Sequence, residues 1–101
     1  VFGKPAVGPW LLPALQAVAA PAALHLDIIK EIASDMLDCI RAFHDPAAGI
    51  HVVDTCGTLT PAAPNATGDD ADWVNEIHPN AAGYAKLAAK FRPQLAALGV
   101  T

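Results

Sequence analysis

The chain has 101 residues and a formal net charge of −4, with 53% hydrophobic and 16% charged residues. This size gives one small domain, and the composition excludes a disordered tail and, as a default, a binder of nucleic-acid phosphates. Two cysteines are too few for a disulfide-stapled miniprotein, and no run approaches the ~20 apolar residues of a membrane span.

Two helices are predicted in the first half of the chain. Residues 10–20 are rich in Ala and Leu, which indicates a short helix that ends at Pro21. Residues 23–43 form the stronger prediction, because apolar side chains recur every three or four positions with acids between them, as in a helix with one buried face. These apolar residues are Leu24, Ile28, Ile29, Ile32, Met36, Leu37, Ile40 and Phe43.

The second half combines a strand, a long connection and a helix. The segment 50–54 is short and rich in β-branched residues, which predicts a strand. A polar stretch rich in Gly and Pro follows over residues 55–79, and such a length is uncommon unless the connection is functional or disordered. Asn80 is a suitable N-cap for a last helix from about Ala81, which Pro93 is expected to kink or split.

A lone strand leaves its backbone N–H and C=O groups without partners. Helix, strand, loop and helix in this order are typical of an open α/β sheet. We therefore expect residues 1–101 to be the mostly helical C-terminal segment of a larger α/β domain whose other strands lie elsewhere. The rival is an all-helical bundle in which residues 50–54 are an extended link.

His78 is the focal residue of the long connection. Pro79 favours an extended backbone at His78, just before the N-terminus of the last helix. The positive end of that helix disfavours the imidazolium, and a neutral imidazole is what a general base needs. Asp72, Asn75 and Glu76 are close enough in sequence to orient the ring.

The sequence His78-Pro79-Asn80, followed by Gly83-Tyr84, resembles the last block of the SGNH/GDSL hydrolases. Three further segments match the family in order: Gly8-Pro9-Trp10-Leu11, Val53-Asp54-Thr55 with Thr58-Leu59, and residues 72–79. The resemblance implies a three-layer α/β/α fold with a flavodoxin-like parallel sheet. It also implies a carboxylic-ester hydrolase, an esterase or lipase, that needs no cofactor.

The resemblance further implies that His78 is the base of a Ser-His-Asp triad. The family's acid lies three residues before the His, where this chain has Asn75, so we favour Asp72 as the acid and keep Asn75 as the alternative. The family's nucleophilic Ser lies upstream, and Ser34 has no Gly neighbours to form a nucleophile turn. We expect the segment to be inactive alone and to need the upstream part of the same hydrolase, as missing sequence or as a separate chain.

Trp10 and Trp73 are candidate contacts for a small-molecule or lipid ester. No metal is expected, because the four histidines, at positions 25, 44, 51 and 78, have no recognised ligand spacing. Two other function classes stay open. One is a non-catalytic helical protein-interaction module that uses residues 24–43, and the other is a thiol hydrolase that pairs Cys56 with His78.

Overall fold

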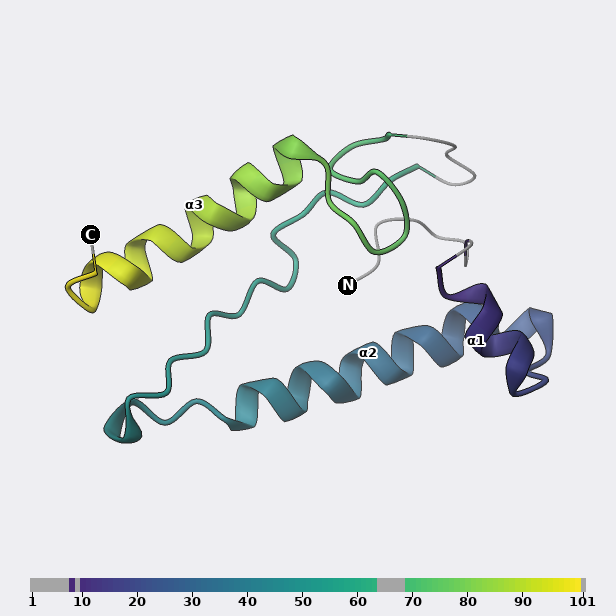
Figure 1. The fold of residues 1–101 in the computed structure, drawn as a ribbon, viewed down its shortest axis with the longest axis horizontal. Coiled ribbons are helices and arrows are strands. Elements are labelled where there is room, and N and C mark those ends of the chain that lie inside the picture. Colours follow the sequence, from purple (N-terminus) through teal and green to yellow (C-terminus); the bar gives the residue numbers. More distant parts are fainter. Residues whose placement is uncertain (1–7, 9, 64–68, 101) are drawn as a thin grey trace.

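The structure is a computed structural model that describes residues 8, 10–63 and 69–100. Its elements are three α-helices and two short 3-10 helices, which are α1 (Leu12–Ala17), η1 (Ala22–Leu24), α2 (His25–Ala42), η2 (Pro46–Ala48) and α3 (Ala81–Ala97). Figure 1 shows α2 and α3 as two separate rods, with a long extended segment running between them.

The α/β fold with a three-layer parallel sheet, predicted for residues 1–101, is wrong. In residues 8, 10–63 and 69–100 there is no β-strand and no sheet. The predicted strand, residues 50–54, runs extended, with one isolated bridge at Ile50 and a hydrogen bond of 3.1 Å from the Val52 N–H to His44 Nδ1. A β-branched pattern favours a strand, but a strand forms only beside a neighbour that completes its ladder. In the part of the chain that the structure describes, no strand lies beside residues 50–54.

Helix α2 forms where its periodicity predicts, with Asp27 in its first turn and Arg41 in its last, both favourable to the helix dipole. Arg41 also bonds Asp54 of the extended segment at 2.6 Å. The buried face expected of this helix is formed only in part, because Ile29 and Ala33 are the two residues of α2 that are buried. The other large apolar side chains of the stripe are half-buried or exposed, and those that are exposed are Leu24, Ile32, Met36, Ile40 and Phe43.

Helix α3 begins where its cap predicts. The Asn80 side chain accepts a hydrogen bond from the Gly83 N–H at 3.0 Å, which satisfies one of the free donors of the first turn. Pro93 lies inside the helix, which continues to Ala97. The missing N–H of Pro93 therefore costs the helix one bond without splitting it.

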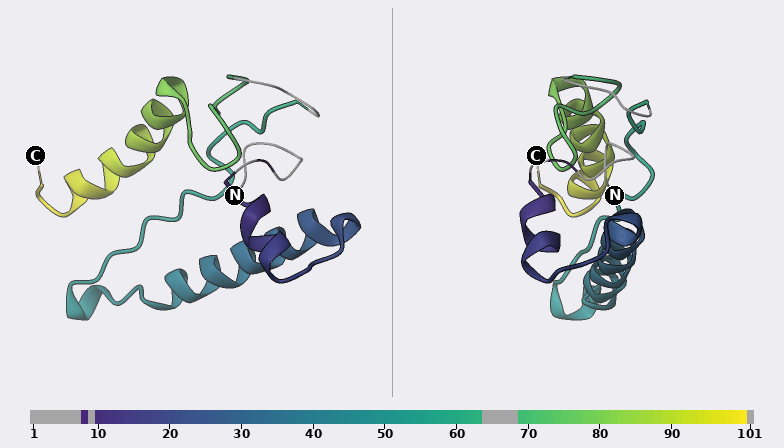
Figure 2. Two further views of the ribbon diagram at one scale, coloured as in Figure 1. Left: turned by 45° about the vertical axis from the view of Figure 1, so that its right-hand side comes forward. Right: turned by 90° about the vertical axis from the view of Figure 1, so that its right-hand side faces the viewer.

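The elements make an open molecule. Its extents are 47 × 27 × 17 Å and its radius of gyration is 15.9 Å, above the ~13 Å of a compact domain of 100 residues. Figure 2 shows the same separation of the helices from two further sides. Among the described residues, the buried apolar side chains are Leu15, Ile29, Ala33, Ala62 and Trp73. No helix in this part of the chain has the length and apolar character that a bilayer span requires.

The exposed face of α2 predicts strong binding of the dye ANS. Replacing Ile32 and Met36 by Glu should lower ANS fluorescence by about half, because the two residues lie in the middle of the exposed apolar stripe of α2. The helicity measured by circular dichroism should not change, since both side chains are exposed. Ser34→Glu, on the same helix and also exposed, is the matched control. Equal ANS signals from the double variant and this control would contradict the exposed face.

Candidate functional site

The connection before α3 is folded by hydrogen bonds. Asp70 and Trp73 exchange backbone N–H···O=C bonds of 2.9 Å, which closes a tight turn. The Asn80 N–H donates to the Asp72 carbonyl at 2.9 Å, and the Asn80 amide nitrogen donates to the Ala71 carbonyl at 3.0 Å. The N-cap of α3 is thereby fixed to the turn that precedes it.

His78 lies on the second half of this connection and is held by Asn75. The Asn75 side-chain oxygen accepts the Ile77 N–H at 3.0 Å and the His78 N–H at 2.9 Å. The same oxygen lies 2.9 Å from His78 Nδ1. The Val74 N–H donates back to the His78 carbonyl at 2.9 Å, so the loop closes on itself and the imidazole is half-buried.

These contacts determine the tautomer of the imidazole. The Asn75 atom that faces the ring already accepts two backbone N–H groups, so it is the amide oxygen and not the nitrogen. An oxygen without a proton can only accept from Nδ1, so Nδ1 carries the hydrogen. The Nε2 lone pair of His78 is then free to take a proton, and Nε2 has no hydrogen-bond partner among the described residues.

Asp72, the favoured triad acid, is placed elsewhere. It is 3% exposed, and its Oδ2 accepts both the Lys86 ammonium and the Thr60 N–H at 2.6 Å. The bond to Lys86 first, and then the bond to Thr60, holds the pKa of the Asp72 carboxyl below its usual value. The structure thus brings Asn75, and not Asp72, to the imidazole.

Gly83 explains how α3 approaches Asp72 so closely. A Cβ at this position would meet the Asp72 carbonyl oxygen in a clash and would lie 2.9 Å from the Cβ of Pro79. Residue 83 must therefore be Gly for the first turn of α3 to rest on the turn. One turn further along the same helix, Lys86 reaches the Asp72 carboxylate.

Glu76, the third candidate for orienting His78, bonds the opposite end of the chain. It is 3% exposed, and its Oε1 accepts the Trp10 N–H at 2.7 Å and the Leu11 N–H at 3.2 Å. The ring centroids of Trp10 and His78 are 5.0 Å apart and the ring planes make an angle of 72°, which is an edge-to-face contact. Such aromatic pairs contribute ~0.5–1.5 kcal/mol beyond burial.

The two tryptophans differ in their surroundings. Trp73 is buried and its indole N–H donates to the Thr60 carbonyl at 3.0 Å, so it joins the loop to the extended segment. Trp10 is 59% exposed beside the imidazole. Of the two indole rings, the one that contacts the His78 ring among the described residues is that of Trp10.

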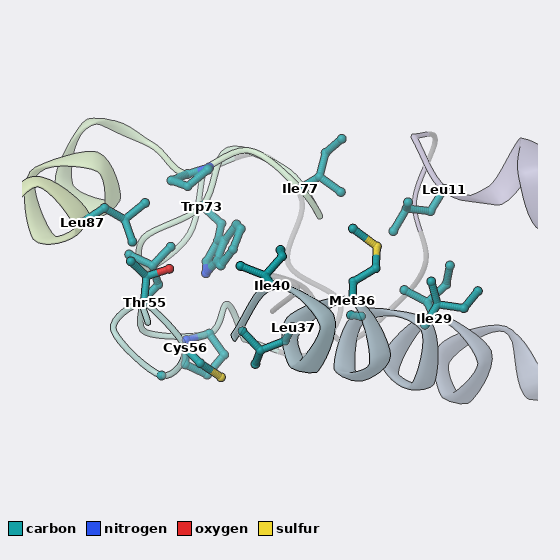
Figure 3. A pocket seen from close by; sticks show the side chains of 16 residues that line it. Leu11, Ile29, Met36, Leu37, Ile40, Thr55, Cys56, Trp73, Ile77 and Leu87 are labelled. Carbon is teal, nitrogen blue, oxygen red and sulfur yellow. The ribbon is translucent and has the colours of Figure 1, made fainter. Parts of the chain in front are cut away.

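An open apolar groove of about 710 Å³ lies beside the loop. Figure 3 shows Met36 and Ile40 of α2 facing Trp73 and Ile77 across it. Ile77 and Pro79, the two neighbours of His78 in sequence, line the groove, whereas His78 itself does not.

Cys56 also lines the groove. It is free and exposed, as is Cys39, and its backbone N–H donates to Asp54 Oδ1 at 2.9 Å. The polar side-chain partner of the His78 ring among the described residues is Asn75, not this thiol. In the described part of the chain no three His, Cys, Asp or Glu side chains gather as metal ligands would.

No protein-family model, no curated protein and no solved structure matches this chain. Sequence reasoning did not find Lys86 or Thr60, whose bonds hold Asp72. Lys86 lies three residues after Gly83 on the same helix face, and this spacing is a sequence signal for its bond to Asp72. No local pattern marks the bond between Thr60 and Asp72.

The tautomer of His78 is directly measurable. In mildly alkaline solution, ¹⁵N spectra of the imidazole should show hydrogen on Nδ1 in the native chain. Asn75→Ala removes the acceptor, so the hydrogen should shift substantially to Nε2, the form that predominates in an unconstrained ring. Asn75→Asp retains an acceptor and should keep Nδ1–H. A native chain with hydrogen on Nε2 would contradict the assignment.

The buried Asp72 predicts an acid-sensitive fold. Because its folded pKa lies below the unfolded value of about 3.8, its stabilising effect is present above that pH and is lost as the pH falls through the folded pKa. Asp72→Asn should lower the free energy of unfolding at neutral pH and flatten its decline in acid, as followed by denaturant titrations. Asp69→Asn, at an exposed acid of the same loop, should leave the pH profile unchanged. Parallel profiles for Asp72→Asn and the native chain would refute this role.

Proposed function

We propose that this chain supplies the general base of a serine ester hydrolase of the SGNH type. The observation that carries the proposal is the bond between His78 Nδ1 and the Asn75 oxygen, which leaves the Nε2 lone pair free. A neutral imidazole held in this tautomer is what a hydroxyl nucleophile needs beside it. The block from His78 to Tyr84, which resembles the last block of that family, supports the same reaction.

In the proposed reaction a serine hydroxyl attacks the ester carbonyl while His78 Nε2 takes its proton. The imidazolium then gives that proton to the leaving alcohol, and an acyl-serine remains. Water attacks the acyl-serine by the same route, with His78 again as base, and the acid is released. The Asn75 oxygen keeps Nδ1–H oriented throughout, in place of the carboxylate of the usual triad.

The serine has to come from outside the loop. Ser34 is exposed on α2, and no hydroxyl group bonds Nε2 of His78 among the described residues. We place the nucleophile on upstream sequence of the same hydrolase, continuous with this chain or separate from it. A polypeptide in that position would also cover the apolar groove beside the loop, which borders the two neighbours of His78.

A second candidate function is a helical protein-interaction module. The observation that favours it is the exposed apolar face of α2, with Ile32 50% and Met36 59% exposed. Patches of this kind mark protein interfaces. This function would use the helix face alone and would need neither His78 nor Asn75, which separates it from the hydrolase by mutation.

The test is hydrolysis of 4-nitrophenyl butyrate by this chain and by the encoded polypeptide that contains it with its upstream sequence. The chain alone should be inactive and the longer polypeptide active. His78→Ala in the longer polypeptide should lower kcat by about 10³-fold or more, and Asn75→Ala by about 10²-fold. Cys56→Ala is the control and should retain full activity.

Each other outcome contradicts the proposal. Loss of activity in Cys56→Ala would favour the thiol hydrolase instead. A longer polypeptide that hydrolyses the ester equally well with and without His78 would remove the general base. A longer polypeptide without any esterase activity would leave the interaction module as the better function.

A further inference from the structure

The contact between the N-terminal segment and the His78 loop has no role in the reaction as described above. It joins residues that are 66 positions apart, through the Trp10 N–H and Glu76. A buried carboxylate is costly unless it is paired or bonded, so its partners indicate what it does. Among the described residues, the hydrogen-bond partners of Glu76 are two backbone N–H groups of one short segment, those of Trp10 and Leu11.

We infer that Glu76 is a positioning residue that holds the Trp10 ring against the His78 imidazole. The inference rests on the proposed function of His78 as base and adds a second constraint on that ring. Asn75 fixes one edge of the imidazole through Nδ1. Trp10 contacts the ring itself, 5.0 Å away at 72°, and so limits its rotation about the bond to Cβ.

Trp10 cannot hold this position by its own burial, since it is 59% exposed. Its backbone is held instead. Glu76 Oε1 accepts the N–H groups of Trp10 and Leu11 at 2.7 and 3.2 Å, and the Gly8 carbonyl accepts the Leu12 N–H at 3.0 Å. The backbone at Trp10 and Leu11 is thus fixed by hydrogen bonds to the Glu76 carboxylate.

Gly8 shows how closely the turn fits the carboxylate. A Cβ at this position would overlap Glu76 Oε2 and lie 2.9 Å from its carboxyl carbon. Any other residue would push the carboxylate or the turn away. The close fit ties the position of the turn, and with it the Trp10 backbone, to the Glu76 carboxylate.

The experiment is an NMR measurement on the chain itself, which needs no esterase activity. The native chain should show nuclear Overhauser effects between the His78 and Trp10 rings, and a ring-current shift of the His78 protons. Trp10→Leu should abolish the shift. Glu76→Ala should abolish most of it, Glu76→Gln should retain part of it because its amide oxygen still accepts an N–H, and Glu76→Ala combined with Trp10→Leu should equal Trp10→Leu alone.

Asp45→Ala is the matched control. Asp45, the N-cap of η2, also accepts two backbone N–H groups, from Ala47 at 3.1 Å and Ala48 at 3.2 Å, but η2 lies away from the loop that carries His78 (Figure 1). Its loss should leave the His78 signals unchanged. If Glu76→Ala leaves the ring contact as in the native chain, or if Asp45→Ala disturbs it equally, the inference is overturned.

The longer polypeptide gives the activity readout. Glu76→Ala and Trp10→Leu should each lower kcat for 4-nitrophenyl butyrate by about 10- to 100-fold with KM nearly unchanged, as expected for a misplaced base. Glu76→Gln should recover part of the loss. An unchanged kcat with a lost ring contact would refute the positioning role, whereas an inactive parent polypeptide would refute the proposed function and leave the NMR result to decide the contact.

Discussion

The loop that carries His78 is held by side-chain acceptors and not by a hydrophobic core. Irregular segments must satisfy their backbone N–H groups somewhere, and three polar side chains of this loop accept such groups, from the loop itself and from two segments that it contacts. Asn75 accepts two of them within the loop, Asp72 accepts one from Thr60, and Glu76 accepts two from the N-terminal segment. Asn75 and Glu76 thereby fix the two contacts of the imidazole, the bond at Nδ1 and the Trp10 ring, whereas Asp72 joins the loop to Thr60.

Because each acceptor has its own partners, Asp72 and Glu76 do not bind the His78 ring although they are close to it in sequence. A carboxylate is acceptor-only, and a buried one goes to the partners that compensate its charge. For Asp72 that partner is the Lys86 ammonium at 2.6 Å, and for Glu76 it is a pair of N–H groups. The neutral Asn75 is left to orient the ring, and its oxygen serves because backbone donors have already fixed which way the amide faces.

The helices and their caps could be predicted from sequence, because periodicity and capping are local. Residues 25–42 and 81–97 are helical, and Asn80 caps the latter, as expected. The strand at residues 50–54 could not be decided in this way, since a strand depends on a neighbour that no local pattern reveals. The choice between Asp72 and Asn75 as partner of His78 could not be made from sequence for a similar reason. Asp72 is bound instead by Lys86 and Thr60, which are distant from it in sequence. The bond of Glu76 to Trp10 spans most of the chain and has no local signature.

The proposed function gives the open shape and the site one physical explanation. A chain with 53% hydrophobic residues and an exposed apolar helix face gains by burying that face against another polypeptide. In the proposed hydrolase the same polypeptide brings the nucleophile to Nε2 of His78, so covering the groove and completing the site are one event.

The most direct measurement is a crystal structure of the longer polypeptide after reaction with diethyl 4-nitrophenyl phosphate, which phosphorylates active serines. The account predicts a diethylphosphoryl group on an upstream serine whose Oγ lies within hydrogen-bond reach, about 3 Å, of His78 Nε2. A phosphoryl group on a residue remote from His78, or an unmodified protein, would contradict it.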